Sequence, residues 1–190
     1  MIVFVERRLM DFRKLEKYLY VVLIVSFLGT LISACVNKKE QYVKQWYGKT
    51  IQFPDSMTFK RHARDKCFDY RGGRYKVLIL LGNVECISCR LKIDDWQRFI
   101  QDVDTTVLGV NYIFIMNPVY QRELYTILKL HEFSIPVCVD NNEDIRLLNN
   151  MPLNTSHVFL LDQQNRIICV GNPITNRHIR ELYKKYLLNE

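Results

Sequence analysis

The chain has 190 residues, of which 48% are hydrophobic and 25% are charged. These values are typical of a globular protein, so they exclude a disordered chain and a multispanning membrane protein. The length suits one compact domain preceded by a leader. The formal net charge is +7, but no basic stripe with interleaved aromatic side chains is present, so we expect no nucleic-acid partner.

The N-terminal segment has the pattern of an export signal. A basic segment precedes Tyr18–Ala34, a run without charged residues that is shorter than the roughly 20 residues of a spanning helix. The run ends in Ile32-Ser33-Ala34-Cys35, which resembles the bacterial lipobox. That resemblance implies cleavage before Cys35 and diacylation of its thiol, and two acyl chains anchor a protein stably. We therefore expect a lipoprotein signal peptide at 1–34, with an uncleaved signal anchor as the alternative.

The region after the leader is expected to lie outside the cytoplasm, facing the periplasm or the cell exterior. Residues 35–45 are interpreted as a polar tether, and ordered structure is predicted to begin at Trp46. Residues 55–74 have no pattern that assigns a helix or a strand. Lys76–Leu81 is a continuous apolar run, which predicts a strand buried on both faces of a sheet.

An amphipathic helix is predicted after this strand. Ile93, Trp96, Ile100 and Val103 recur at steps of 3, 4 and 3, and polar residues fill the positions between them. Val110–Met116 then predicts a second buried strand. A strand, a helix and a second buried strand in this order favour a right-handed parallel β-α-β unit.

The C-terminal half completes an α/β pattern. The expected elements are a helix around Leu124–Leu128, a short strand at Ile135–Val139, a helical turn at Glu143–Leu148, strands at His157–Asp162 and Arg166–Val170, and a final helix with Ile179, Leu182 and Tyr186 on its apolar side. The polar residues between the last two strands predict an antiparallel hairpin. The sequence therefore predicts a central mixed sheet flanked by helices over residues 46–190.

One pair among the six cysteines has the spacing of a functional motif, Cys86-Ile87-Ser88-Cys89. A CxxC that lies between a strand and a helix is typical of a redox dithiol. The helix N-terminus stabilises a thiolate, so Cys86 is predicted to be the nucleophile. Cys89, one turn along, can then attack the mixed disulfide and release the reduced substrate. The alternative is a structural disulfide or an inert pair.

The order of these elements resembles the thioredoxin-like superfamily. Four segments also resemble membrane-anchored lipoproteins of the thiol-disulfide interchange and redoxin type from Bacteroides-type anaerobes: Trp46-Tyr47-Gly48-Lys49, Cys86–Lys92, Phe159–Asp162 and Gly171–Ile174. The resemblance runs from about Tyr47 to Leu187. It implies a thiol-disulfide oxidoreductase that reduces or isomerises the cysteines of exported proteins. An upstream thiol reductant would recycle the enzyme. The resemblance implies no cofactor, and it leaves the oligomeric state open.

The chain departs from this superfamily beside the motif. Ser156 stands where relatives carry a cis-proline, and Glu85 precedes the first cysteine, where a carboxylate raises the pKa of a neighbouring thiol. Ser156 and His157 are predicted to lie near the cysteines and to contact substrate. His157 could be a base or a third ligand, with Cys86 and Cys89, for a soft metal. It could also be an ordinary polar residue at a strand edge.

Two other hypotheses for the function of the protein therefore remain, besides the oxidoreductase. One is a soft-metal-binding protein of thioredoxin fold, and the other is a scaffold whose redox chemistry has decayed. Cys138 and Cys169 lie in apolar strands and are expected to be buried small hydrophobes. Cys67 lies in the unassigned region, where it could pair with another cysteine or act as a resolving thiol.

Overall fold

The computed structural model describes residues 17–26, 38–84, 91–104, 109–153 and 155–188. The chain divides into two compact units, Met1–Gln45 and Trp46–Glu190. The described part of the first unit is helical at 17–26 and from 38 onward. Within the described ranges, no helix combines the length and the apolar character that crossing a membrane requires.

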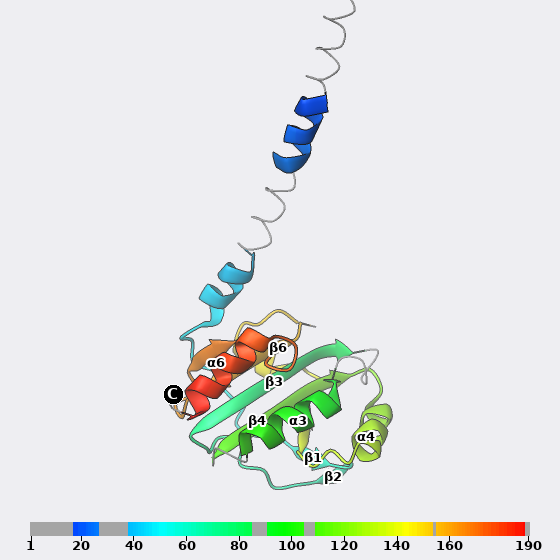
Figure 1. Cartoon of the computed structure of the whole chain (residues 1–190). Coiled ribbons are helices and arrows are strands. Elements are labelled where there is room, and N and C mark those ends of the chain that lie inside the picture. The colour runs from blue at the N-terminus through cyan, green and yellow to red at the C-terminus, as the bar shows by residue number, and fades with distance from the viewer. Residues whose placement is uncertain (1–16, 27–37, 85–90, 105–108, 154, 189–190) are drawn as a thin grey trace, which may run out of the picture. The chain divides into compact units, whose positions relative to one another are not determined.

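The second unit is built on a seven-stranded mixed sheet (Figure 1). Its strands run in the order β2-β1-β5-β4-β3-β6-β7. The strands are β1 (Phe59–Arg61), β2 (Arg64–Asp65), β3 (Tyr75–Val84), β4 (Val110–Pro118), β5 (Val137–Val139), β6 (His157–Leu161) and β7 (Ile167–Val170). The helices are α3 (Ile93–Asp104), α4 (Gln121–Leu130), α5 (Asp144–Leu148) and α6 (Arg177–Leu188).

β3 is the longest strand, with 10 residues, and lies inside the sheet between β4 and β6. It pairs in parallel with β4, after the α3 crossover, and antiparallel with β6. Val77, Leu78, Ile79 and Leu80 are fully buried, as the continuous apolar run predicts for a strand covered on both faces. The predicted β-α-β unit and the antiparallel hairpin of β6 with β7 are confirmed.

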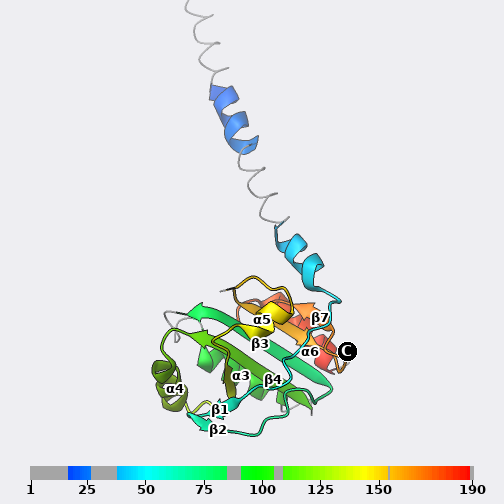
Figure 2. The ribbon, with the colours of Figure 1, turned by 180° about the vertical axis from the view of Figure 1, so that it is seen from behind.

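Different elements of the structure pack on the two faces of the sheet. Alternate side chains of β3, β4 and β6 pack with α3, α4 and α6 in the main core, where Trp96 meets Phe114 edge to face. Trp46 packs against Phe159 on the opposite face, which α5 and the segment after Trp46 cover (Figure 2). The fold class expected from the sequence, a central mixed sheet flanked by helices, is confirmed.

The structure differs from the sequence-based expectation in two places. The β1–β2 hairpin lies in the region that has no sequence pattern, and β1 joins the sheet beside β5. In α6 the buried side chains are Tyr183 and Leu187, whereas Tyr186 is 37% exposed. Tyr183 is held in the core because its hydroxyl donates a hydrogen bond to the Gly171 carbonyl, at 3.0 Å.

Candidate functional site

The predicted dithiol, Cys86 and Cys89, lies outside the described residues, as does the predicted lipidation site, Cys35. The described structure frames the motif on both sides along the chain. β3 ends at Val84 and α3 begins at Ile93. Lys92 has a φ of 47°, and its carbonyl accepts the N–H groups of Asp95 and Trp96, so Lys92 forms the start of the first turn of α3.

The segment that precedes β6 reaches the end of β3. The hydroxyl of Ser156 accepts a hydrogen bond from the backbone N–H of Gly82, at 3.4 Å. Ser156 is exposed, whereas Gly82 is buried. Gly82 lies four positions before Cys86 in the sequence. No peptide bond among the described residues is cis, so the Thr155–Ser156 bond is trans, as the absence of proline predicts. The segment therefore joins the strand that leads into the motif.

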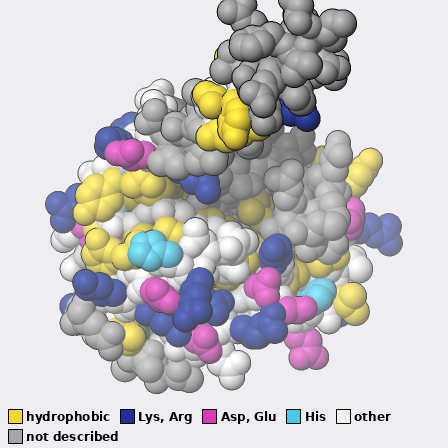
Figure 3. Space-filling view, turned by 45° about the horizontal axis from the view of Figure 1, so that its top comes forward, with side chains coloured by type: hydrophobic (Ala, Val, Ile, Leu, Met, Phe, Trp, Pro, Cys, Tyr) yellow, Lys and Arg dark blue, Asp and Glu magenta, His cyan; other side chains and the backbone are white. Residues whose placement is uncertain are grey.

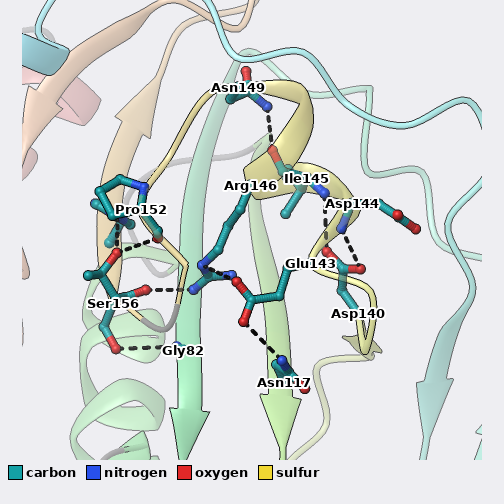
Figure 4. A network of polar contacts seen from close by, with 12 residues as sticks. Gly82, Asn117, Asp140, Glu143, Asp144, Ile145, Arg146, Asn149, Pro152 and Ser156 are labelled. Carbon is teal, nitrogen blue, oxygen red and sulfur yellow. Dashed lines mark hydrogen bonds and ion pairs between the residues drawn. The ribbon is translucent and has the colours of Figure 1, made fainter.

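A buried arginine binds the backbone of the segment that precedes β6 (Figure 4). Arg146 of α5 is 1% exposed and donates from Nη2 to the Thr155 carbonyl, at 2.6 Å. Its Nε lies 3.6 Å from Glu143 Oε2. Burial lowers the pKa of Arg146, and the charges of Glu143 and Asp140 oppose that shift. Arg146 therefore fixes the backbone one residue before Ser156.

Glu143 links the same cluster to β4. Its Oε1 accepts a hydrogen bond from Asn117 Nδ2, at 3.0 Å. The backbone of Glu143 is left-handed, with a φ of 56°, directly before α5 begins. Asp140 caps that helix, because its carboxylate accepts the N–H groups of Asp144 and Ile145. We call Asn117, Glu143, Arg146 and Thr155 the Arg146 cluster.

His157 is neutral and its Nε2 atom is engaged. The Thr155 hydroxyl donates its one hydrogen to the Pro152 carbonyl, at 2.7 Å. The same oxygen lies 2.7 Å from His157 Nε2, so it accepts a hydrogen bond and Nε2 carries the proton. Burial, and secondarily the Arg146 charge, lowers the pKa of His157 to about 4. The imidazole is therefore uncharged at neutral pH.

The ring of His157 lies on the face of the sheet opposite to α3. It stacks on Phe159 and meets Trp46 edge to face, with ring centroids 5.6 Å apart in both pairs. The next residue, Val158, belongs to the core that α3 covers, because successive strand residues point to opposite faces. His157 is 3% exposed, so the structure makes it a packed, hydrogen-bonded side chain.

The three described cysteines differ sharply in environment. Cys138 and Cys169 are buried and free, as expected, and Cys67 is exposed and free. Burial raises the pKa of the Cys138 thiol to about 12 and that of the Cys169 thiol to about 11. Because the thiolate is the reactive form, these two buried thiols are inert at neutral pH.

Metal binding finds no support in the described ranges, which contain no group of three or more His, Cys, Asp or Glu side chains able to hold an ion. The metal alternative itself includes Cys86 and Cys89, which lie outside those ranges.

The Arg146 cluster was not predicted from the sequence. The one feature of the sequence that could have indicated it is an arginine and a glutamate three residues apart within the predicted helical turn at Glu143–Leu148.

Comparison with known proteins agrees with this architecture. No family model and no curated protein matches the sequence. Among solved structures, the thioredoxin domain of a thiol-disulfide oxidoreductase from Bacteroides vulgatus matches with a TM-score of 0.57 and 10% identity, over 74% of this chain and 97% of that one. The chain has a thioredoxin-like fold. At this identity the likeness concerns the fold alone.

Two further structures extend the comparison. A thiol:disulfide interchange protein from Bacteroides sp. has a TM-score of 0.55 and 11% identity, over 76% of this chain and 91% of that one. A putative thiol:disulfide interchange protein DsbE from Chlorobium tepidum has a TM-score of 0.53 and 13% identity, over 74% of this chain and 96% of that one. The thioredoxin-like unit of this chain therefore spans nearly the whole of each neighbour.

Proposed function

We propose that the protein is a membrane-tethered thiol-disulfide oxidoreductase that uses Cys86 and Cys89 on exported proteins. The observation that carries the proposal is the sequence position of the CxxC motif. It falls between β3, an interior strand of a thioredoxin-like sheet, and α3. The similar structures named as thiol-disulfide oxidoreductase and interchange proteins support the same chemistry.

In the proposed reaction, the Cys86 thiolate attacks one sulfur of a client disulfide. A Cys86–client mixed disulfide forms, and the second client sulfur leaves as a thiolate and takes up a proton. The Cys89 thiolate then attacks the Cys86 sulfur, so the Cys86–Cys89 disulfide forms and the first client sulfur leaves. Two electrons pass from the pair to the client, and an upstream thiol reductant restores the dithiol.

In this reaction, Thr155 and Ser156, which precede β6, would form an exposed surface beside the CxxC motif. The backbone of this segment is fixed by Arg146 through Thr155 and by Gly82 through the Ser156 hydroxyl. A client peptide would then meet a rigid segment, which lowers the entropy lost on binding. The buried, hydrogen-bonded His157 argues against the metal-binding alternative, because its Nε2 is already committed to Thr155.

The experiment is a redox titration of the full chain in mild detergent. We expect a two-electron couple between about −270 and −120 mV, the range of known oxidoreductases. We expect Cys89→Ser to accumulate mixed disulfides with client proteins and Cys86→Ser to accumulate none. Cys67→Ser is the matched control, since Cys67 is exposed and free, and it should leave the couple unchanged. A pair that cannot be cycled would contradict the proposal.

The membrane tether is a separate part of the proposal and has its own test. We propose that Cys35 is the lipidation site, since it alone follows the small residues that end the uncharged run. Cys35→Ala should abolish labelling by a radioactive fatty acid and leave the precursor uncleaved. Cys67→Ala again serves as control and should be labelled like wild type. Undiminished labelling of Cys35→Ala would disprove lipidation there.

A further inference from the structure

A basic cavity lies at the β1–β2 hairpin. Its volume is about 470 Å³, and its lining comprises Arg61, His62, Arg64, Asp65, Lys66 and Lys129. Four of these side chains are basic and one is acidic. Five come from the hairpin and its exit, and Lys129 comes from α4. On the face seen in Figure 3, by contrast, basic and acidic side chains interleave. The hairpin cavity is therefore a local concentration of positive charge.

The hairpin holds like charges against each other. Arg61 and Arg64 are direct cross-strand partners on either side of the turn, an arrangement that repulsion between like charges makes unfavourable. The one carboxylate in the lining, Asp65, lies 3.8 Å from Lys60, outside the cavity. A bound anion would neutralise the two guanidinium groups that the protein itself places together.

The turn carries one further feature that a ligand would explain. The φ values of 50° and 65° at His62 and Ala63 are those of a two-residue hairpin turn, so the backbone itself points to no ligand. Among the described residues, none supplies a hydrogen-bond partner to His62 Nε2, although that atom is buried. A buried ring nitrogen without a partner that lines a basic cavity is positioned to contact a bound polar group.

Charged residues on an edge strand also guard against aggregation, and β2 is the last strand of the sheet. That role accounts for the charge of Arg64. It does not account for the contribution of Lys129 from α4 to the same cavity or for the buried nitrogen of His62. The cavity therefore requires an explanation of its own.

We propose that this hairpin cavity binds a phosphate-bearing anion. Guanidinium groups match the oxygens of phosphate in bidentate geometry, and lysines add point charges. The volume exceeds the needs of a bare phosphate and lies in the lower part of the range for small-molecule sites, about 300–1,000 Å³. A phosphate ester, either a soluble metabolite or a lipid headgroup, fits this chemistry. The site does not depend on the dithiol.

The test is a calorimetric titration of the full chain, in neutral detergent at low ionic strength, with inorganic phosphate. Sodium chloride at matched ionic strength is the reference. We expect saturable one-site binding by wild type, weakened about tenfold or more in Arg61→Gln/Arg64→Gln. The matched double variant Arg166→Gln/Arg177→Gln removes two exposed arginines elsewhere and should bind like wild type. Equal binding by all three proteins would overturn the proposal.

A melting experiment separates loss of binding from loss of folding. Without phosphate, Arg61→Gln/Arg64→Gln should melt no lower than wild type, because the variant removes a repulsive pair. With phosphate, the melting temperature of wild type should rise and that of the variant should not. An equal rise in both proteins would contradict the assignment of the site.

Competition then identifies the source of the anion. Glycerol 3-phosphate and monomeric short-chain phosphatidylglycerol are each used to displace bound phosphate. Tighter competition by the lipid assigns the site to a membrane headgroup, and tighter competition by glycerol 3-phosphate assigns it to a soluble ester. Failure of both to compete would overturn the proposal that phosphate esters are the ligands.

Discussion

The Arg146 cluster and the hairpin cavity each bring several charged side chains together, but only in the Arg146 cluster does the basic group face an opposite charge. In the Arg146 cluster, the guanidinium faces Glu143 and a backbone carbonyl, and the carboxylate is held in turn by Asn117. At the hairpin cavity, basic side chains face one another across the turn. Burial is the cause of the difference, because an unpaired charge is costly inside a protein and tolerable in water.

The comparison separates what a charge does for the fold from what it offers to a ligand. Every polar contact described for Arg146 is internal, so the cluster fixes the segment before β6. The hairpin arginines lie in solvent, and their exposure leaves them available to an outside partner. Substitutions should therefore have large effects on stability in the first region and small ones in the second.

The largest expected effect is that of Glu143→Gln. It keeps the shape of the side chain and removes the charge opposite Arg146, so a buried cation loses its nearest counter-ion. We expect the free energy of unfolding to fall by about 3 kcal/mol, measured by denaturant titration. Glu123→Gln, at an exposed position in the first turn of α4, is the control and should change it by less than about 0.5 kcal/mol. Equal effects would refute the assigned role of the pair.

The next effect concerns pH and His157. Its pKa is about 4 in the folded chain, below the ordinary histidine value of 6.5. The unfolded chain therefore binds more protons between these two values, and stability falls as pH falls through this window. From about pH 7.5 to about pH 5 the loss should be about 2 kcal/mol. His157→Phe should remove this part of the pH dependence in denaturant titrations. His178→Phe, at an exposed histidine, should retain it in full.

A smaller effect is expected for Ser156→Ala. The change removes the hydroxyl that accepts the Gly82 N–H, and the bond is long at 3.4 Å. We expect the free energy of unfolding to fall by about 1 kcal/mol or less. Hydrogen exchange at the Gly82 amide should accelerate, while Ser134→Ala, at an exposed serine, should leave that amide unchanged. Unaltered exchange in Ser156→Ala would show that the bond does not hold the segment.

The smallest effect is expected for Lys60→Gln at the hairpin. Lys60 and Asp65 lie 3.8 Å apart, and their side chains are 41% and 78% exposed. Exposed pairs of this kind contribute little, so thermal and denaturant unfolding should change by less than about 0.5 kcal/mol. A loss as large as that of Glu143→Gln would erase the contrast between the two regions.

The sequence was sufficient for the elements whose patterns are set by burial along the chain. The continuous apolar run predicted β3, and the helical spacing of Ile93 and Trp96 predicted α3. The β1–β2 hairpin was not predicted from the sequence, because its strands are short and basic. Its turn residues, His62 and Ala63, also lack the asparagine-glycine pair that is typical of such turns. Its left-handed backbone is visible only in the structure.

The surroundings of the candidate site could be predicted only in part. The resemblance to thioredoxin-like proteins predicted that Ser156 lies near Cys86 and Cys89, which are outside the described residues, so that placement stays a prediction. The structure shows Ser156 hydrogen-bonded to Gly82 of β3. Arg146 could not be found, because an arginine among apolar residues usually reaches solvent. Its burial arises from the packing of α5, which brings it to a carbonyl nine residues further along the chain.

The positions of Cys138 and Cys169 in the sheet have a consequence for disulfide formation. Spare thiols in an oxidising compartment invite scrambled bridges. These two lie in β5 and β7, with three strands between them, so they are about 19 Å apart at ordinary strand spacing. A disulfide requires Cα atoms within about 7 Å. Once the sheet has assembled, these two thiols therefore cannot form a disulfide with each other, even under oxidising conditions.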